Sequence, residues 1–100
     1  MQEFQLRRDR EAPLVFTGEM LAEVSTRAER PRWAELRLYR TRSGAMVAEE
    51  VGKTTVDGEC DRHKVWYCHD ATDVRHNLGD GSLAKQLYLE AGLDGVESVK

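Results

Sequence analysis

Cysteine and histidine side chains, which are the usual protein ligands of zinc, gather between positions 60 and 76 of this chain. The set is Cys60, His63, Cys68, His69 and His76. Its spacing matches no common zinc finger or knuckle, and in an extended strand Cys60 and Cys68 would lie about 26 Å apart. Neighbouring members of the set would also point to opposite faces of that strand. We therefore expect no metal site and no cofactor.

The same two cysteines bear on redox and nucleophilic chemistry. A disulfide needs Cα atoms within about 7 Å, so Cys60 and Cys68 are expected to remain free thiols. A cysteine nucleophile with a histidine base is formally available, but the sequence around it carries no positioning motif. We expect Cys68 to pack as a small apolar side chain.

Two further groups have compositions that could support chemistry. Residues 79–83, Gly-Asp-Gly-Ser-Leu, resemble a phosphate-binding loop before a helix, but the lysine and the βαβ context of a P-loop are missing. We expect a plain loop between helices there. Five carboxylates surround a predicted hairpin and indicate a solvated acidic edge, with no support for acid–base catalysis; these are Glu49, Glu50, Asp57, Glu59 and Asp61. The chain is thus expected to have no catalytic residues and not to be an enzyme.

Residues 33–41, Trp-Ala-Glu-Leu-Arg-Leu-Tyr-Arg-Thr, alternate with the period of a β-strand. Leu36 and Leu38 point to one face, and Trp33, Arg37 and Tyr39 point to the other. Trp, Arg and Tyr dominate interface hot spots, so this second face is our candidate binding surface. The full set of candidate binding residues is Trp33, Arg37, Tyr39, Arg40, Arg42, Arg30 and Arg32. The alternative is that a helix covers Trp33 and Tyr39, or that the arginines pair across strands with Glu19, Glu23 and Glu49.

Length and composition predict a single domain over residues 1–100, with 40% apolar and 33% charged residues. No apolar run approaches the roughly 18 residues of a membrane span, and no secretory signal begins the chain. A soluble cytoplasmic protein is expected. The net charge is −3, yet residues 27–42 hold six arginines against two glutamates. This distribution permits a local basic patch and argues against general coating of nucleic acid.

The elements that must position these residues follow from hydrophobic period and turn chemistry. Residues 3–7 predict a first strand. In residues 14–24 the apolar side chains share one parity, which predicts a half-buried strand; they are Leu14, Phe16, Met20, Ala22 and Val24. The alternative is a helix that begins at Gly18 and is capped by Thr17. Residues 25–32 are polar and predict an exposed loop.

Two hairpins are expected in the middle of the chain. Residues 42–44, Arg-Ser-Gly, can close the first, after which residues 45–56 return beside the tryptophan-bearing strand, with Gly52 at a bulge or bend. The dipeptide Asp57-Gly58 suits a two-residue hairpin loop with positive φ at both residues. A strand over residues 59–69 should follow.

The last third changes to a helical period. Asp70 can cap a helix that runs to Leu78, with Asp73 in its first turn and Gly79 beyond its end. Ser82 is expected to cap a second helix, and Gly92 followed by Leu93 predicts a left-handed stop. The apolar stripe of that second helix comprises Leu83, Leu87 and Ala91 beside Ala84 and Tyr88. The predicted fold class is α+β: an antiparallel meander of four to five strands followed by two short C-terminal helices packed on one face.

Two stretches carry a family resemblance. Residues 16–23, Phe-Thr-Gly-Glu-Met-Leu-Ala-Glu, and residues 36–44, Leu-Arg-Leu-Tyr-Arg-Thr-Arg-Ser-Gly, resemble the strand region of the EXLDI family of uncharacterised bacterial proteins. Their order and approximate separation also match. The resemblance implies a bacterial or mobile-element origin and supplies no activity or catalytic residues.

From these patterns we expect a non-enzymatic protein-interaction module of bacterial, phage or plasmid origin, whose partner is another protein or a second copy of the chain in a homodimer. The alternative is a small nucleic-acid-binding accessory protein, with the arginine-rich loop on phosphates and Tyr39 or Trp33 on bases. No membrane and no small-molecule substrate is expected as a partner.

Overall fold

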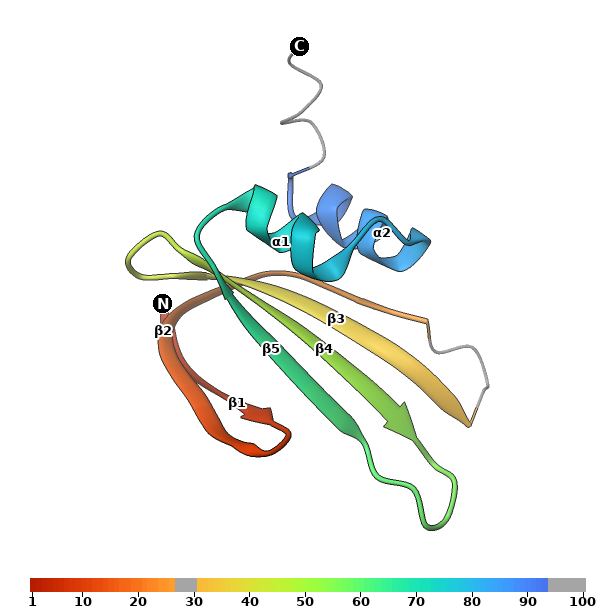
Figure 1. The fold of residues 1–100 in the computed structure, drawn as a ribbon. Helices are drawn as coiled ribbons and strands as arrows, with labels where there is room; N and C mark the ends of the chain where they lie inside the picture. The colour runs from red at the N-terminus through yellow and green to blue at the C-terminus, as the bar shows by residue number, and fades with distance from the viewer. Residues whose placement is uncertain (27–30, 94–100) are drawn as a thin grey trace.

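The computed structural model describes residues 1–26 and 31–93 and confirms the α+β class (Figure 1). Five antiparallel strands form one sheet in the order β1-β2-β3-β4-β5, and two helices follow it. The elements are β1 (Gln2–Arg8), β2 (Glu11–Ser25), β3 (Arg32–Thr41), β4 (Met46–Thr54), β5 (Arg62–Cys68), α1 (Ala71–Leu78) and α2 (Ser82–Glu90). Every strand therefore pairs with its neighbour in the sequence, as a meander requires.

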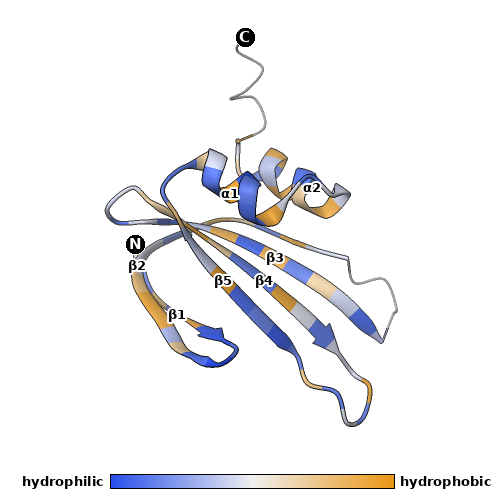
Figure 2. Ribbon diagram, viewed as in Figure 1, coloured by the Kyte–Doolittle hydropathy of each residue, from blue (hydrophilic) through white to orange (hydrophobic). Residues whose placement is uncertain are grey.

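The helices cover the leucine face of the sheet and close the first core (Figure 1). Leu36 and Leu38 of β3 meet Val74 of α1 and Leu87 of α2 there, and all four side chains are buried. In β3 the apolar residues of this face alternate with charged ones, and the ribbon of β3 changes colour along its length (Figure 2). The expected role of Cys68 is confirmed, because its side chain is fully buried in this core.

The opposite face of the sheet carries a second core beneath the β1–β2 hairpin, which arches away from the helices (Figure 1). Its buried members are Leu6, Tyr39 and Val47, with Phe4, Leu14, Phe16 and Val65 packed against them. The chain thus builds two apolar clusters, one on each face of a single sheet.

The long strand β2 serves both cores. Met20 pairs with Tyr39 and Ala22 pairs with Leu38, so Leu21 is an extra residue that reverses which parity faces which side. As a result Phe16 packs in the second core whereas Ala22 packs in the first. The predicted strand is confirmed over its helical alternative, but its apolar residues do not share a single face.

The two predicted hairpins differ in outcome. The first is confirmed: residues 42–45 connect β3 to β4, and Gly44 has the positive φ of 96° expected of it. The prediction of a two-residue loop at Asp57-Gly58 is wrong, because residues 55–61 connect β4 to β5 and Gly58 is the residue of this loop with a positive φ. The side chains of Thr54, Glu59 and Asp61 bond within this longer loop or to the ends of its strands, which provides polar partners that a tight turn does not need.

The helix boundaries follow local capping chemistry. The Asp70 carboxylate accepts a hydrogen bond from the Asp73 N–H, and the Gly79 N–H donates to the Arg75 carbonyl, as predicted. The Leu93 N–H donates to the Tyr88 carbonyl after Gly92 at φ 79°, which confirms the left-handed stop. Ser82 is not a cap, because it is the first residue of α2 and makes no side-chain capping bond. No helix in the described residues has the length and apolar character to cross a membrane.

Two strand glycines have opposite surroundings. A Cβ built on Gly18 would lie 2.1 Å from the carbonyl oxygen of Arg40, so the backbone of β3 occupies the space that any other side chain needs. Gly52 was expected at a bulge or bend; it pairs in regular register with Ala34 and Arg62, so the prediction of a bulge is wrong. A Cβ at Gly52 would meet only the Arg62 Cβ, at an ordinary 3.7 Å.

We predict that Gly18→Ala lowers the free energy of unfolding by at least about 1–3 kcal/mol, because the strands must separate to admit the methyl group. Gly52→Ala is the matched control and should leave stability unchanged or raise it by up to about 1 kcal/mol, since alanine restricts the unfolded chain. Urea denaturation of both variants measures the difference. Equal stability of the two variants would contradict the close approach at Gly18.

Candidate functional site

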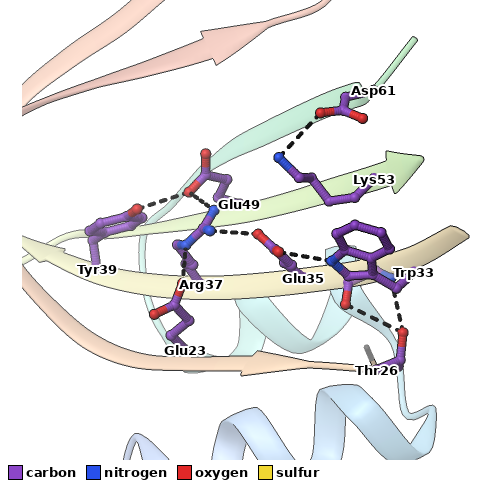
Figure 3. A network of polar contacts seen from close by, with 10 residues as sticks. Glu23, Thr26, Trp33, Glu35, Arg37, Tyr39, Glu49, Lys53 and Asp61 are labelled. Atoms are coloured by element: carbon purple, nitrogen blue, oxygen red, sulfur yellow. Dashed lines mark hydrogen bonds and ion pairs between the residues drawn. The ribbon is translucent and has the colours of Figure 1, made fainter. Parts of the chain in front are cut away.

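The face of β3 opposite the helices carries a polar network centred on Arg37 (Figure 3). Its guanidinium donates from Nε to Glu23 Oε2 at 2.6 Å and from Nη2 to Glu35 Oε1 at 2.6 Å. A third bond runs from Nη1 to Glu49 Oε1 at 3.4 Å. Glu23 and Glu49 stand directly opposite Arg37 on β2 and β4, so the strand register itself places this ion network.

Tyr39 closes the network on the side of the second core. Its hydroxyl donates to Glu49 Oε1 at 2.8 Å, and its ring contacts the rings of Phe4 and Phe16 with centroids 4.8 and 5.4 Å away. Only 2% of Tyr39 and 6% of Glu49 is exposed. The prediction of a solvated carboxylate is therefore wrong for Glu49. The expected open position of Tyr39 is not observed either, because the β1–β2 hairpin, and not a helix, covers its ring.

Burial and charge together fix the protonation of this network. Burial raises the pKa of Tyr39, and the hydrogen bond to Glu49 and the charge of that carboxylate raise it further, so the phenol stays protonated. Burial alone would lower the pKa of Arg37, but Glu23, Glu49 and Glu35 outweigh it and raise that pKa. The network consequently holds one permanent cation among three carboxylates, and its bonds join β2, β3 and β4.

Trp33 connects this network to a cleft at the start of β3. Partial burial favours a higher pKa for Glu35, yet the bond from the Trp33 indole and the charge of Arg37 lower that pKa overall. The indole Nε1 donates to Glu35 Oε2 at 2.9 Å, which fixes the ring while leaving part of it exposed. The ionised Glu35 is thus bonded at once to the cleft residue Trp33 and to Arg37.

The cleft has a volume of about 920 Å³ and lies where the tip of the β1–β2 hairpin approaches the loop between β4 and β5. It is lined by Asp9, Arg10, Arg32, Trp33, Gly52, Lys53, Thr54, Glu59, Cys60, Asp61 and Arg62. Such a volume falls within the range of small-ligand pockets. Trp33 is the only aromatic side chain among these lining residues.

Ion pairs compensate most of the charge around the cleft. Arg32 forms a bidentate pair with Glu59, and Lys53 Nζ lies 3.2 Å from Asp61 Oδ2. The bonds from Arg32 and Thr54 lower the pKa of Glu59 to about 2. Four cationic and three acidic side chains line the cleft, which gives it a formal charge of +1 in a chain of net charge −3.

The hairpin tip is fastened to β5 by residues far apart in sequence. The Asp9 N–H donates to the His63 carbonyl at 3.1 Å, and the His63 N–H donates to Asp9 Oδ2 at 3.0 Å. The next residue, Arg10, has a φ of 65° and is the only residue other than glycine in the described chain with a positive φ. These bonds hold the Arg10 backbone at the edge of the cleft.

The structure separates the described candidate binding residues into three places. Trp33 and Arg32 line the cleft, whereas Arg37 and Tyr39 belong to the polar network. Arg40 and Arg42 are exposed at the opposite end of β3, and Arg30 lies outside the described residues. Sequence reasoning missed Arg10, Lys53 and Arg62 as cleft residues. The available signal was the charged Asp9-Arg10 pair between two alternating strands, which predicts a hairpin tip but not what the tip touches.

The cysteines and histidines do not come together. Cys60 is exposed beside the cleft, and Cys68 is buried in the first core, where burial raises the pKa of its thiol. Both are free thiols. In residues 1–26 and 31–93, no group of three or more histidine, cysteine or acidic side chains is arranged to hold a metal ion.

Comparison with known proteins does not assign the chain to a family. No protein-family model, no curated protein and no solved structure matches the chain. The resemblance of two strand segments to the EXLDI family therefore stays a prediction, and function is argued below from the site residues alone.

We predict that Arg37→Met lowers the free energy of unfolding by about 3 kcal/mol at pH 7, because Glu49 is left buried without its cation. Arg37 helps to lower the pKa of Glu35, so this pairing contributes stability above the usual glutamate pKa, and the loss should shrink as the pH falls and Glu35 takes up a proton. Urea denaturation at several pH values measures both effects. The control Arg40→Met removes an exposed arginine of the same strand and should change stability by less than about 0.5 kcal/mol. Equal losses in both variants would contradict a structural role for the network.

We also predict a pH-dependent effect of Glu59→Gln. The pKa of Glu59 falls from its usual 4.5 to about 2 in the folded chain, so its pairing stabilises the fold above pH 4.5 and is lost as the pH falls towards 2. The melting temperature of the parent chain should exceed that of the variant by a small amount at pH 7, because the pair is exposed, and the two should converge near pH 2. Glu3→Gln, an exposed glutamate of β1, serves as the charge control. A difference that persists at pH 2 would show that the ion pair is not its source.

Proposed function

We propose that this protein is a non-enzymatic, cytoplasmic protein-interaction module whose cleft binds an extended segment of a partner protein. The observation that carries the proposal is Trp33. Its ring is partly exposed in a cleft of about 920 Å³, and its Nε1–H is fixed by Glu35. Pre-ordered tryptophan side chains in concave sites are the residues most often found to dominate binding energy.

The surroundings of Trp33 support a role in binding over one in catalysis. The ionisable groups next to it on the same face of the sheet, Glu35, Arg37 and Glu49, are engaged with one another and with Tyr39. An acid, base or nucleophile needs a free position next to its substrate, whereas a binding aromatic needs a rigid support. The network supplies such a support, because it joins β2, β3 and β4 next to the cleft and is bonded to Trp33 through Glu35.

A protein segment suits the cleft better than a nucleic acid does. Arg32 and Lys53 are already paired with Glu59 and Asp61, which leaves a formal charge of only +1 around the cleft. A run of phosphates would require several uncompensated cations. The nucleic-acid alternative keeps the exposed Arg40 and Arg42 as its basis, but they lie at the other end of β3 from Trp33.

Selection of random peptides displayed on phage tests this proposal. We expect the parent chain to enrich peptides that lose binding by at least tenfold when Trp33 is replaced by alanine, because truncation of a hot-spot tryptophan costs about 2 kcal/mol or more. Tyr67→Ala is the matched control: Tyr67 is an aromatic residue of β5 that is 58% exposed and lies outside the cleft. Circular dichroism should show that both variants remain folded.

Three results would overturn the proposal. One is that no peptide is enriched in a Trp33-dependent manner. Another is that Trp33→Ala abolishes a dimer seen by sedimentation at rising protein concentration, which would make a second copy the occupant of the cleft. A third is that single-stranded DNA binds with an affinity that falls steeply between low and moderate salt, as phosphate contacts require.

A further inference from the structure

Arg10 occupies a backbone conformation that favours glycine. Its φ of 65° lies in the left-handed region, which is unfavourable for a residue with a Cβ and readily adopted by glycine. Arginine is not among the residues enriched at such positions, which are glycine, asparagine and aspartate. Unfavourable backbone conformations of this kind concentrate at functional sites, where the side chain is needed in one place.

The position of Arg10 is set by its neighbour. Asp9 forms two hydrogen bonds with the backbone of His63, and these hold the hairpin tip against β5 beside the cleft. Among the four cations that line the cleft, Arg32 and Lys53 are paired with Glu59 and Asp61, whereas the side chains of Arg10 and Arg62 make no hydrogen bond or ion pair with any residue of the described chain. Of these two, Arg10 is the one at a left-handed backbone position. The backbone of Arg10 is thus fixed beside the cleft, while its exposed guanidinium has no ion-pair partner in the described chain.

The chemistry around Arg10 indicates what it binds. A guanidinium matches a carboxylate in geometry and charge, and the aromatic ring of Trp33 suits an apolar side chain nearby. We infer that Arg10 binds a carboxylate of an acidic, partly apolar segment of a partner protein that occupies the cleft. This inference rests on the function proposed above and specifies the chemistry of the partner.

An NMR titration of the whole chain tests the inference, because the protein has two tryptophans with separate indole N–H signals. Trp33 lines the cleft, whereas Trp66 packs against the first core and serves as an internal control. The probes are the peptides acetyl-(Glu-Leu)₃-amide and acetyl-(Lys-Leu)₃-amide, the oligonucleotide dT₆, and sodium glutamate. We expect the acidic peptide to shift the Trp33 signal saturably and leave the Trp66 signal in place.

The variant Arg10→Gly should weaken binding of the acidic peptide roughly tenfold, as expected when a charge-assisted hydrogen bond is lost. Its melting temperature should be unchanged or higher, because glycine accepts the left-handed conformation without strain. The control Arg42→Gly removes the same charge from the far end of β3 and should bind the acidic peptide as the parent chain does.

The remaining outcomes separate this inference from the proposed function. Equal binding of the basic peptide, equal affinity of Arg10→Gly, tighter binding of dT₆, or saturation by sodium glutamate at the same concentration would each overturn the role of Arg10. If peptides selected through Trp33 lack carboxylates, the interaction function stands and this inference fails. If no peptide depends on Trp33, both fail.

Discussion

The structure depends on one constraint: a single strand, β2, must supply apolar side chains to opposite faces of the sheet. The extra residue at Leu21 meets this constraint by reversing the side-chain alternation in the middle of the strand. Gly18 then allows the backbone of β2 to lie against that of β3 at a separation that no side chain would permit. The β1–β2 hairpin consequently bends under the sheet, where it covers Tyr39 and brings Asp9 and Arg10 to β5.

Covering that face also buries polar groups, and the network around Arg37 satisfies them. Arg37 is matched by carboxylates on the strands on either side, so burial of Glu49 and Tyr39 leaves no uncompensated charge next to the second core. Among the described residues, no buried side-chain nitrogen or oxygen atom lacks a hydrogen-bond partner. The same network also fixes Trp33, because Glu35 accepts hydrogen bonds from both Arg37 and the Trp33 indole. The bonds that stabilise the covered face therefore also order one wall of the cleft.

The cleft and the network therefore have different tasks on one strand. Trp33, Arg37 and Tyr39 share one face of β3 but have different surroundings along the strand. Tyr39 lies under the hairpin, Arg37 is bonded to carboxylates of the neighbouring strands, and Trp33 lies at the end of β3 that the hairpin does not cover. The gradient from covered to open follows from the length of the hairpin. The binding function proposed above falls at the open end, with the charged tip of the hairpin beside it.

The sequence by itself determined the features that arise within a few residues of each other. Strand alternation in β3, the Asp70 cap, the stop at Gly92 and the turn at Gly44 are all local, because their hydrogen bonds and φ preferences involve neighbours in the chain. That was enough to predict the meander and both helices. Only the tertiary structure decided which polar residues are buried and which residues form the cleft. Glu49 and Tyr39 are covered, and Arg10 reaches the cleft, because the reversal at Leu21 folds the hairpin back onto the sheet. The tip of this hairpin contacts His63, which is more than fifty positions away from Asp9 in the sequence. No local pattern encodes a contact between such distant segments.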